Sequence, residues 1–202
     1  MRLYFSQSSP FVRKVLVCAH ELGLADRIEN LPSAAHPVDT DKTIAGDNPL
    51  GQVPTFLTDD GHALYDSRVI CEYLDVLGGG ALFPAGAARW PALVRQSEAD
   101  GLLDAALLAR YEGAVRPAEH RWAAWTDGQM RKITRTLDHF EANIAAIDGV
   151  VDIGTISVGC ALGYLDFRFA DLGWRPSRPK LADWYARFGE RPSMAATRPP
   201  AA

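Results

Sequence analysis

Cysteine is scarce in this sequence, and its positions exclude several kinds of site. Cys18, Cys71 and Cys160 lie far apart, each in an apolar stretch. No CxxC pair occurs and no Cys/His cluster has metal-ligand spacing, which excludes the common zinc and dithiol redox motifs. We therefore expect three buried, reduced thiols and no metal, and we predict a cytoplasmic location.

The sequence also lacks a charge excess of either sign and a long apolar run. Lys and Arg number 21 against 25 Asp and Glu, for a net charge of −4. This balance gives no electrostatic case for a nucleic-acid partner or an anionic membrane surface. No apolar stretch approaches the roughly 20 residues that span a bilayer, and no signal-peptide layout is found. With 48% apolar residues the chain can build a sizeable core, so we predict a soluble globular protein.

The N-terminal part of the chain alternates strand and helix patterns. The DG pair within DDGH, at 59–62, indicates a hairpin turn between two short apolar segments. The patterns predict, in order, a strand at Arg2–Phe5, a helix at Pro10–Leu22, a strand at Asp26–Leu31, a loop over 32–51, strands at Val53–Thr58 and Ala63–Tyr65, and a helix at Ser67–Leu77. The residues alone thus indicate βαβ followed by ββα, a small mixed sheet with helices.

A glycine- and proline-rich stretch, GGGALFPAGAARWP, ends this alternation. Beyond it only helical periodicity is evident, and Pro117 suits the first turn of a helix. The predicted helices are Leu93–Tyr111, Ala118–Ile147, Ile156–Leu172 and Leu181–Phe188. We predict an α/β domain over 1–78, a linker over 79–90 and an all-helical domain over 91–202.

The first strand-to-helix junction reads SQSSPFVRKV, and two interpretations of Ser9 stay open. Ser9 fits the helix N-cap and Pro10 the first helical position, a cap worth about 1 kcal/mol. Alternatively, the Ser9 hydroxyl donates a hydrogen bond to a thiolate, an interaction worth about 1.5–3 kcal/mol. Such a bond would lower a thiol pKa of about 8.5 by roughly one or two units.

Two further junctions combine a structural and a functional interpretation. In NPLGQVPTF, Val53–Pro54 suits the start of a strand, and a cis bond would turn the peptide groups of Val53 toward an extended peptide ligand. In LYDSRVI, Asp66 or Ser67 can cap the following helix. The same pair could hold the charged end of a ligand, with Asp66 on an ammonium and Ser67 on a carboxylate.

The segments SSPFVRKV, NPLGQVPTF, DSRVICEYL and GCALGYLDFRF, in this order, resemble the cytosolic glutathione S-transferase family, in its serine-type form. The resemblance covers essentially the whole chain. It implies a thioredoxin-like N-terminal domain (βαβαββα), an all-helical C-terminal domain, and a homodimer with Asp66–Tyr73 and Ala92–Tyr111 as interface helices. It also implies an enzyme that adds glutathione to a small electrophile or reduces a peroxide, with glutathione as co-substrate and no other cofactor.

The resemblance further assigns roles to individual residues. Relatives that exchange disulfides carry cysteine at the first junction, whereas this chain has serines, which disfavours exchange through a protein thiol. The implied roles are Ser9 on the glutathione sulfur with Ser6 as its rival, Val53 and Pro54 on the cysteinyl segment, Asp66 and Ser67 on the γ-glutamyl end, and Gln52 on the tripeptide backbone.

Three expectations concern the helical half. The family's reciprocal helix cap is inverted here, with Asp152 before Thr155. We expect Asp152 to cap the helix but Thr155 to be too short to reciprocate, at a modest loss of stability. The resemblance implies an acceptor site between the domains, with Arg110 and Tyr111 among its candidates. Trp122 and Trp125 are assigned to packing.

Two alternatives to the enzyme remain: a non-catalytic binding or regulatory protein of the same fold, and a carrier of bulky apolar ligands. A member that had lost the activity would be expected to lose the groups that hold glutathione. Ser9, Val53–Pro54 and Asp66–Ser67 are all present, which favours the enzyme.

Overall fold

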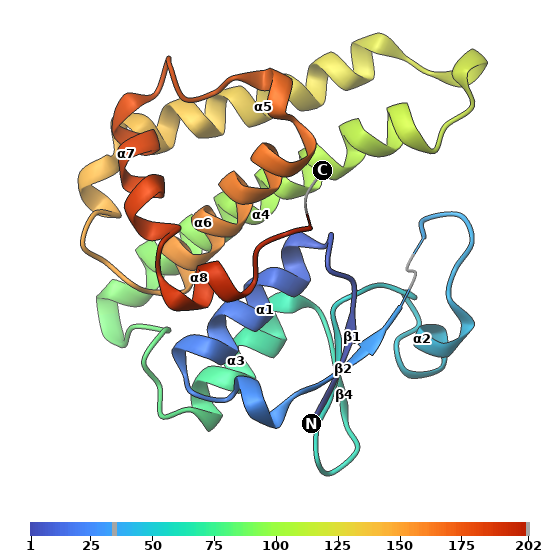
Figure 1. The fold of residues 1–202 in the computed structure, drawn as a ribbon, viewed down its shortest axis with the longest axis vertical. Helices are drawn as coiled ribbons and strands as arrows, with labels where there is room; N and C mark the ends of the chain where they lie inside the picture. Colours follow the sequence, from blue (N-terminus) through green and yellow to red (C-terminus); the bar gives the residue numbers. More distant parts are fainter. Residues whose placement is uncertain (34–35, 201–202) are drawn as a thin grey trace. The chain divides into compact units, whose positions relative to one another are not determined.

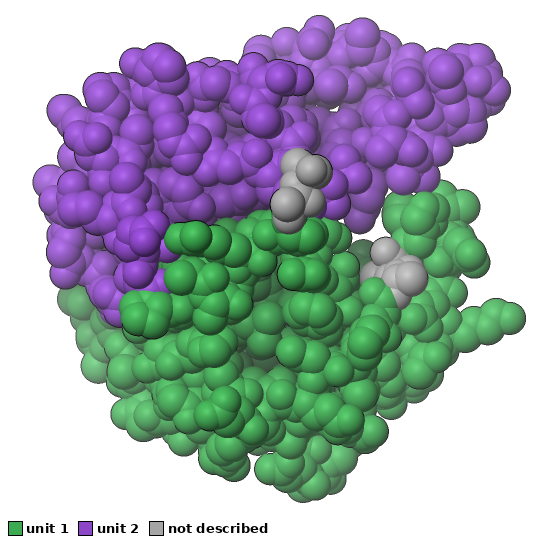
Figure 2. Space-filling view, viewed as in Figure 1, with its two compact units in different colours: residues 1–89, 192–200 green, residues 90–191, 201–202 purple. Residues whose placement is uncertain are grey.

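The computed structural model describes residues 1–33 and 36–200 and divides the chain into two compact units, shown in Figures 1 and 2. Unit 1 comprises Met1–Arg89 and Pro192–Pro200, and unit 2 comprises Trp90–Arg191. The segment Pro192–Pro200, which the sequence places with the helical domain, thus belongs to unit 1. Residues 34–35 of the predicted loop and residues 201–202 of the predicted helical domain lie outside the described residues.

Unit 1 is built on a four-stranded sheet with the order β2-β1-β3-β4. Strand β1 pairs in parallel with β2 and antiparallel with β3, which in turn pairs antiparallel with β4. The strands are β1 (Arg2–Phe5), β2 (Glu29–Pro32), β3 (Thr55–Leu57) and β4 (Ala63–Leu64), and the helices between and after them are α1 (Pro10–Glu21), α2 (Lys42–Asp47) and α3 (Ser67–Leu77). The order βαβαββα confirms the predicted thioredoxin-like fold.

Helices α1 and α3 pack together on one side of the sheet, and α2 lies on the other side (Figure 1). Both long helices turn an apolar face inward because their apolar residues recur at helical spacing. The core of unit 1 includes Leu3 and Phe56 from the strands, Val15 and Cys18 from α1, and Ile70, Cys71 and Leu74 from α3. The three cysteines of the chain are free and buried, as expected.

Helix α2 lies within 32–51, where the residue pattern predicts mostly loop, and it is the second helix of the order βαβαββα that the resemblance implies. Its six residues are too few to show a helical period in the sequence. Asp41 caps it by accepting a hydrogen bond from the Thr43 N–H at 2.8 Å, and Ile44 is buried against Tyr4. The Tyr4 hydroxyl donates to Asp47 at 2.8 Å, a bond that is the main cause of the raised pKa of Tyr4. Tertiary contacts therefore stabilise this helix more than its own propensity does.

Unit 2 is helical, and its core is α6, in which every residue from Ile153 to Leu165 is buried. Around it lie α4 (Arg89–Ala114), α5 (Ala123–Ala142) and α7 (Pro179–Phe188), while the short α8 (Pro192–Ala196) packs on α1 of unit 1. Helix α6 spans Ile153–Arg168. Among the described helices, none combines the length and apolar character required to cross a bilayer.

The connection between α4 and α5 differs from the prediction in two respects. Ala118–His120 forms a separate 3-10 turn, so α5 begins only at Ala123 and Pro117 is not in its first turn. The Glu112 carboxylate holds this connection by accepting a hydrogen bond from the Trp122 N–H at 2.8 Å, which is the main cause of the lowered pKa of Glu112. The assignment of Trp122 and Trp125 to packing was wrong, because their side chains are 65% and 41% exposed.

The N-terminus of α6 also corrects a prediction, because its cap is reciprocal. The Thr155 N–H donates to Asp152 Oδ1, and the Asp152 N–H donates to Thr155 Oγ1, both at 2.9 Å. The threonine hydroxyl therefore reaches the N-cap backbone without the longer side chain of a glutamate. Arg95 Nη2 lies 2.5 Å from Asp152 Oδ2 and joins this cap to α4.

We predict that Thr155→Val lowers the free energy of unfolding by about 1–3 kcal/mol, because the buried Asp152 N–H loses its acceptor while the side-chain volume is kept. Thr155→Ser, which keeps the hydroxyl, is the matched control and is expected to lose less. Denaturant unfolding of both variants measures the difference. A valine variant as stable as the serine variant contradicts the reciprocal cap.

Candidate functional site

Three junctions between strands and helices lie at the same end of the unit 1 sheet. Tyr4 pairs with Thr55 across β1 and β3, so the end of β1 lies beside the start of β3. Phe56 pairs with Leu64 across β3 and β4, so the end of β4 also lies beside the start of β3. The antiparallel register therefore brings the segments 6–9, 53–54 and 65–67 to one end, although they are far apart in the sequence.

Ser9 is the N-cap of α1, as predicted. Its Oγ accepts a hydrogen bond from the Val12 N–H at 3.2 Å, and its backbone N–H donates to the Ser6 carbonyl at 3.0 Å. A hydroxyl can accept and donate at the same time, and the cap uses only acceptor capacity. Within the described residues, the Ser9 hydroxyl hydrogen has no acceptor, so it is available to a ligand.

Ser6, the alternative to Ser9, is in a different situation. Its Oγ lies 3.2 Å from Ser8 Oγ, so the two hydroxyls already form a hydrogen bond with each other. Ser6 also follows β1 directly and is not at the N-terminus of α1. Ser9 alone of the three serines caps a helix, which places it in the positive field of the α1 N-terminus.

The Val53–Pro54 peptide bond is cis, an isomer that the sequence left open. Two buried side chains hold the residue before it. The Gln52 carbonyl accepts hydrogen bonds from Thr55 Oγ1 at 2.7 Å and from Asn48 Nδ2 at 3.4 Å. Asn48 Nδ2 also donates to Thr55 Oγ1 at 2.8 Å. Asn48 and Thr55 thus position this turn, while the Gln52 side chain is exposed.

Asn48 is a functional candidate that the sequence motifs do not indicate. The residue stands in the turn sequence NPLG, where asparagine is common because its side chain bonds to nearby backbone groups. That pattern indicates a turn, and the Asn48 Oδ1 indeed accepts from the Leu50 N–H at 3.0 Å. The second function of the side chain, holding Gln52, depends on the fold around it.

Asp66 and Ser67 lie at the N-terminus of α3. Asp66 is the N-cap, and its Oδ1 accepts from the Arg68 N–H at 2.9 Å. The Asp66 side chain is exposed, so its second carboxylate oxygen remains available to a cation. Ser67 is buried, and its hydroxyl makes no hydrogen bond to another described residue. The peptide bond between Tyr65 and Asp66 is also cis.

The end of the sheet therefore presents the N-termini of two long helices. Helices α1 and α3 have 12 and 11 residues, and each N-terminus carries unpaired backbone N–H groups and about half a positive charge. Such termini stabilise anions. With the Asp66 carboxylate beside them, the arrangement suits a small ligand that carries charges of both signs.

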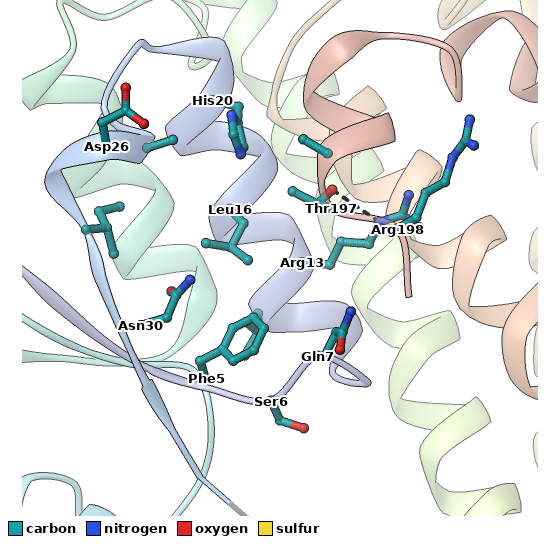
Figure 3. A pocket seen from close by; sticks show the side chains of 14 residues that line it. Phe5, Ser6, Gln7, Arg13, Leu16, His20, Asp26, Asn30, Thr197 and Arg198 are labelled. Carbon is teal, nitrogen blue, oxygen red and sulfur yellow. Dashed lines mark hydrogen bonds between the residues drawn. The ribbon is translucent and has the colours of Figure 1, made fainter. Parts of the chain in front are cut away.

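Unit 1 also contains a pocket of about 310 Å³ beside α1, shown in Figure 3. Ser6 and Gln7 lie at one end of it, and Arg13, Thr197 and Arg198 lie near the C-terminal segment. Arg13 is almost completely buried, and its Nη2 donates to the Met194 carbonyl at 3.1 Å. The pocket includes Ser6 but none of the residues 9, 52–54 and 66–67.

The candidate site is therefore the end of the sheet, not this pocket, because the helix N-termini and the turn before β3 face a ligand only there. In the part of the chain that the structure describes, no group of three or more His, Cys, Asp or Glu residues could hold a metal ion.

Comparisons with known proteins agree with this architecture. Two family models match: Glutathione S-transferase, N-terminal domain, over residues 8–77, and Glutathione S-transferase, C-terminal domain, over residues 123–187. The GST-like protein YibF of Escherichia coli (strain K12), described as uncharacterized, is 36% identical over the whole of both chains.

Two solved structures of a glutathione transferase family member from Pseudomonas fluorescens Pf-5 are 48% identical to this chain. One contains bound glutathione and has a TM-score of 0.96, and the match covers 99% of this chain and 99% of that one. The other contains bound S-(propanoic acid)-glutathione, has a TM-score of 0.92, and the match covers 98% of this chain and 99% of that one. With both domain models matched in sequence order, this chain belongs to the glutathione S-transferase family.

Proposed function

We propose that this protein is a glutathione transferase that binds glutathione at the end of the unit 1 sheet. The main support for this proposal is that Ser9, Val53–Pro54 and Asp66–Ser67 all lie at that end. The bound glutathione and S-(propanoic acid)-glutathione in the Pseudomonas fluorescens relative support the choice of ligand. The second of these ligands also supports a site that accommodates a substituent on the sulfur.

In this proposal each end of the tripeptide has a matching group. The exposed carboxylate of Asp66 binds the ammonium of the γ-glutamyl residue, and the Ser67 hydroxyl with the α3 N-terminus binds its carboxylate. The backbone of Val53 pairs with the cysteinyl residue. Asn48 and Thr55 act as positioning residues because they hold the Gln52 carbonyl, and the exposed Gln52 side chain contacts the tripeptide backbone.

The Ser9 hydroxyl then donates its hydrogen to the glutathione sulfur. Its oxygen remains on the Val12 N–H, so capping and donation occur together. A hydrogen bond to a charged group is worth about 1.5–3 kcal/mol, and 1.36 kcal/mol corresponds to one pKa unit. The thiol pKa of bound glutathione therefore falls by roughly one or two units, with a further contribution from the α1 dipole.

Two reactions are open to this thiolate, and neither needs a cofactor besides the co-substrate glutathione. With an electrophile, the sulfur forms a bond to carbon and the leaving group departs with its bonding electron pair. With a hydroperoxide, the sulfur attacks oxygen, the O–O bond breaks and the alcohol leaves. A second glutathione then displaces water from the resulting sulfenic acid and gives the disulfide. Serine in place of cysteine keeps the protein itself out of both reactions.

A non-catalytic binding protein or a carrier of apolar ligands is the alternative function. Retention on immobilised glutathione separates a protein that holds this ligand from one that has only kept the fold. Turnover with 1-chloro-2,4-dinitrobenzene and with cumene hydroperoxide then separates a transferase, a peroxidase and a binding protein. No retention and no turnover would contradict the proposed function.

We also propose a homodimer in the cytoplasm. In unit 1, α3 exposes Val69 and Val76, at 48% and 77%, and in unit 2, α4 exposes Trp90 and Val94, at 68% and 55%. Exposed apolar side chains grouped on a helix are typical of protein interfaces. The buried, free cysteines suit a reducing compartment. Sedimentation of the purified protein measures the oligomeric state.

We predict that Ser9→Ala lowers the free energy of unfolding by about 1 kcal/mol through loss of the cap. It should also reduce the thiolate fraction of bound glutathione at neutral pH by about tenfold. The ultraviolet absorbance of the thiolate, titrated against pH, measures this fraction. Ser6→Ala is the matched control and should change neither quantity to this extent. If activity follows only the stability loss, or falls only with Ser6→Ala, Ser9 serves as a cap alone.

We further predict that Asn48→Ala and Thr55→Val each weaken glutathione binding by about tenfold, because the Gln52 carbonyl loses a buried donor and the turn loses its position. The double variant should lose less than the sum of the two free energies, since both residues serve one carbonyl. Calorimetric titration of the folded variants measures the affinities. Unchanged affinity in both would show that this turn has no part in binding.

A further inference from the structure

The C-terminal segment Pro192–Pro200 belongs to unit 1, although the residues before it belong to unit 2. Its helix α8 packs against α1, and Figure 1 shows the two helices side by side. Beyond α8, the Thr197 hydroxyl donates to the Ser193 carbonyl at 2.9 Å, which stabilises the last turn of that helix. The last part of the chain therefore lies against the helix that Ser9 caps.

Side-chain contacts attach this segment to both ends of α1. Near the start of α1, Arg13 Nη2 donates to the Met194 carbonyl at 3.1 Å, and Thr197 Oγ1 lies 3.5 Å from Arg13 Nε. At the end of α1, the Ser193 hydroxyl donates to the Glu21 carboxylate. Arg13 and Glu21 are eight positions apart, which is about 12 Å along a helix. The segment therefore holds α1 at two separate points.

The position of the Arg13 side chain depends on the C-terminal segment. Arg13 is 5% exposed, and its Nη1 has no hydrogen-bond partner. Within residues 1–33 and 36–200, no carboxylate pairs with this guanidinium, and its side-chain hydrogen bonds are those to Met194 and Thr197. These two contacts alone therefore give the buried guanidinium hydrogen-bond acceptors in this part of the chain.

The backbone of Arg13 is bonded directly to Ser9. The Arg13 N–H donates to the Ser9 carbonyl at 3.0 Å, and the Val12 N–H donates to Ser9 Oγ at 3.2 Å. These two bonds belong to the first turn of α1, and they set the position of the Ser9 hydroxyl. Hydrogen bonds weaken steeply as the donor angle departs from linear. A shift of this turn would therefore change any bond that the hydroxyl donates to a ligand.

We propose that Arg13 is a positioning residue for Ser9: by anchoring the first turn of α1 to the Met194 carbonyl, it keeps the Ser9 hydroxyl aligned with the glutathione sulfur. The proposal rests on the proposed transferase function, in which this hydroxyl donates to the thiolate. Arg13 makes no contact with glutathione in this proposal and acts only through Ser9. The C-terminal segment thereby takes part in the activation of the thiol.

Amide hydrogen exchange of the free, full-length protein tests the anchor without glutathione. We expect Arg13→Met to speed the exchange of the amide hydrogens of residues 12 and 13, which both donate to Ser9, by about tenfold. Ser193→Ala, which releases the segment at the other end of α1, is the matched control and should leave both rates within about twofold. Unchanged rates in Arg13→Met overturn the proposal, whatever the turnover.

The thiolate absorbance of bound glutathione, titrated against pH, tests the effect on the thiol. Arg13→Met should raise the thiol pKa by about half a unit to one unit, because the Ser9 hydroxyl is less well aligned. In a Ser9→Ala background the same substitution should cause no further rise, since the two residues act as one unit. An equal rise in both backgrounds, or no rise in either, overturns the positioning role.

Circular dichroism confirms that each variant folds. Thr197→Val removes the hydroxyl beside Arg13 Nε and is the second variant, needed where Arg13→Met does not fold. It should raise the thiol pKa by a smaller amount, and an unchanged thiol pKa in this variant then overturns the proposal. Faster exchange in Arg13→Met, together with a wild-type protein that does not lower the thiol pKa, supports the anchor and overturns the transferase function.

Discussion

The antiparallel pairing of β3 with both β1 and β4 is the constraint on which the candidate site depends. Because β3 runs opposite to its two neighbours, its start lies beside both of their ends. The chain therefore enters the site through Val53–Pro54 and leaves it twice, into α1 at Ser9 and into α3 at Asp66. A one-residue slip in either pairing would turn the strand's side chains to the opposite face and separate the three groups.

Much of the fold can be predicted from the sequence because long apolar periods determine it. The helix predicted at Ser67–Leu77 has the observed bounds, and the four strands are found in the predicted order. The pattern fails where a short element depends on distant residues. Helix α2 is one example, since its Asp47 accepts a hydrogen bond from the Tyr4 hydroxyl, 43 residues earlier in the sequence. The reciprocal cap of Asp152 and Thr155 is another, because it depends on the geometry of one turn.

The candidate site, too, could be predicted from the sequence only in part. Sequence motifs identified Ser9 and Asp66, because both stand where a strand meets a helix and each caps that helix. They did not identify Asn48, whose bonds to the turn exist only in the folded chain.

We propose that glutathione binds at the end of the unit 1 sheet, between the N-termini of α1 and α3. The most direct test follows the backbone amide signals of isotope-labelled protein by nuclear magnetic resonance while glutathione is added. We expect the signals of Val53 and Arg68 to shift with glutathione concentration, while those of Leu16 and Asn30, in the pocket beside α1, do not. Shifts confined to Leu16 and Asn30 would place the ligand in that pocket and contradict binding at the end of the sheet.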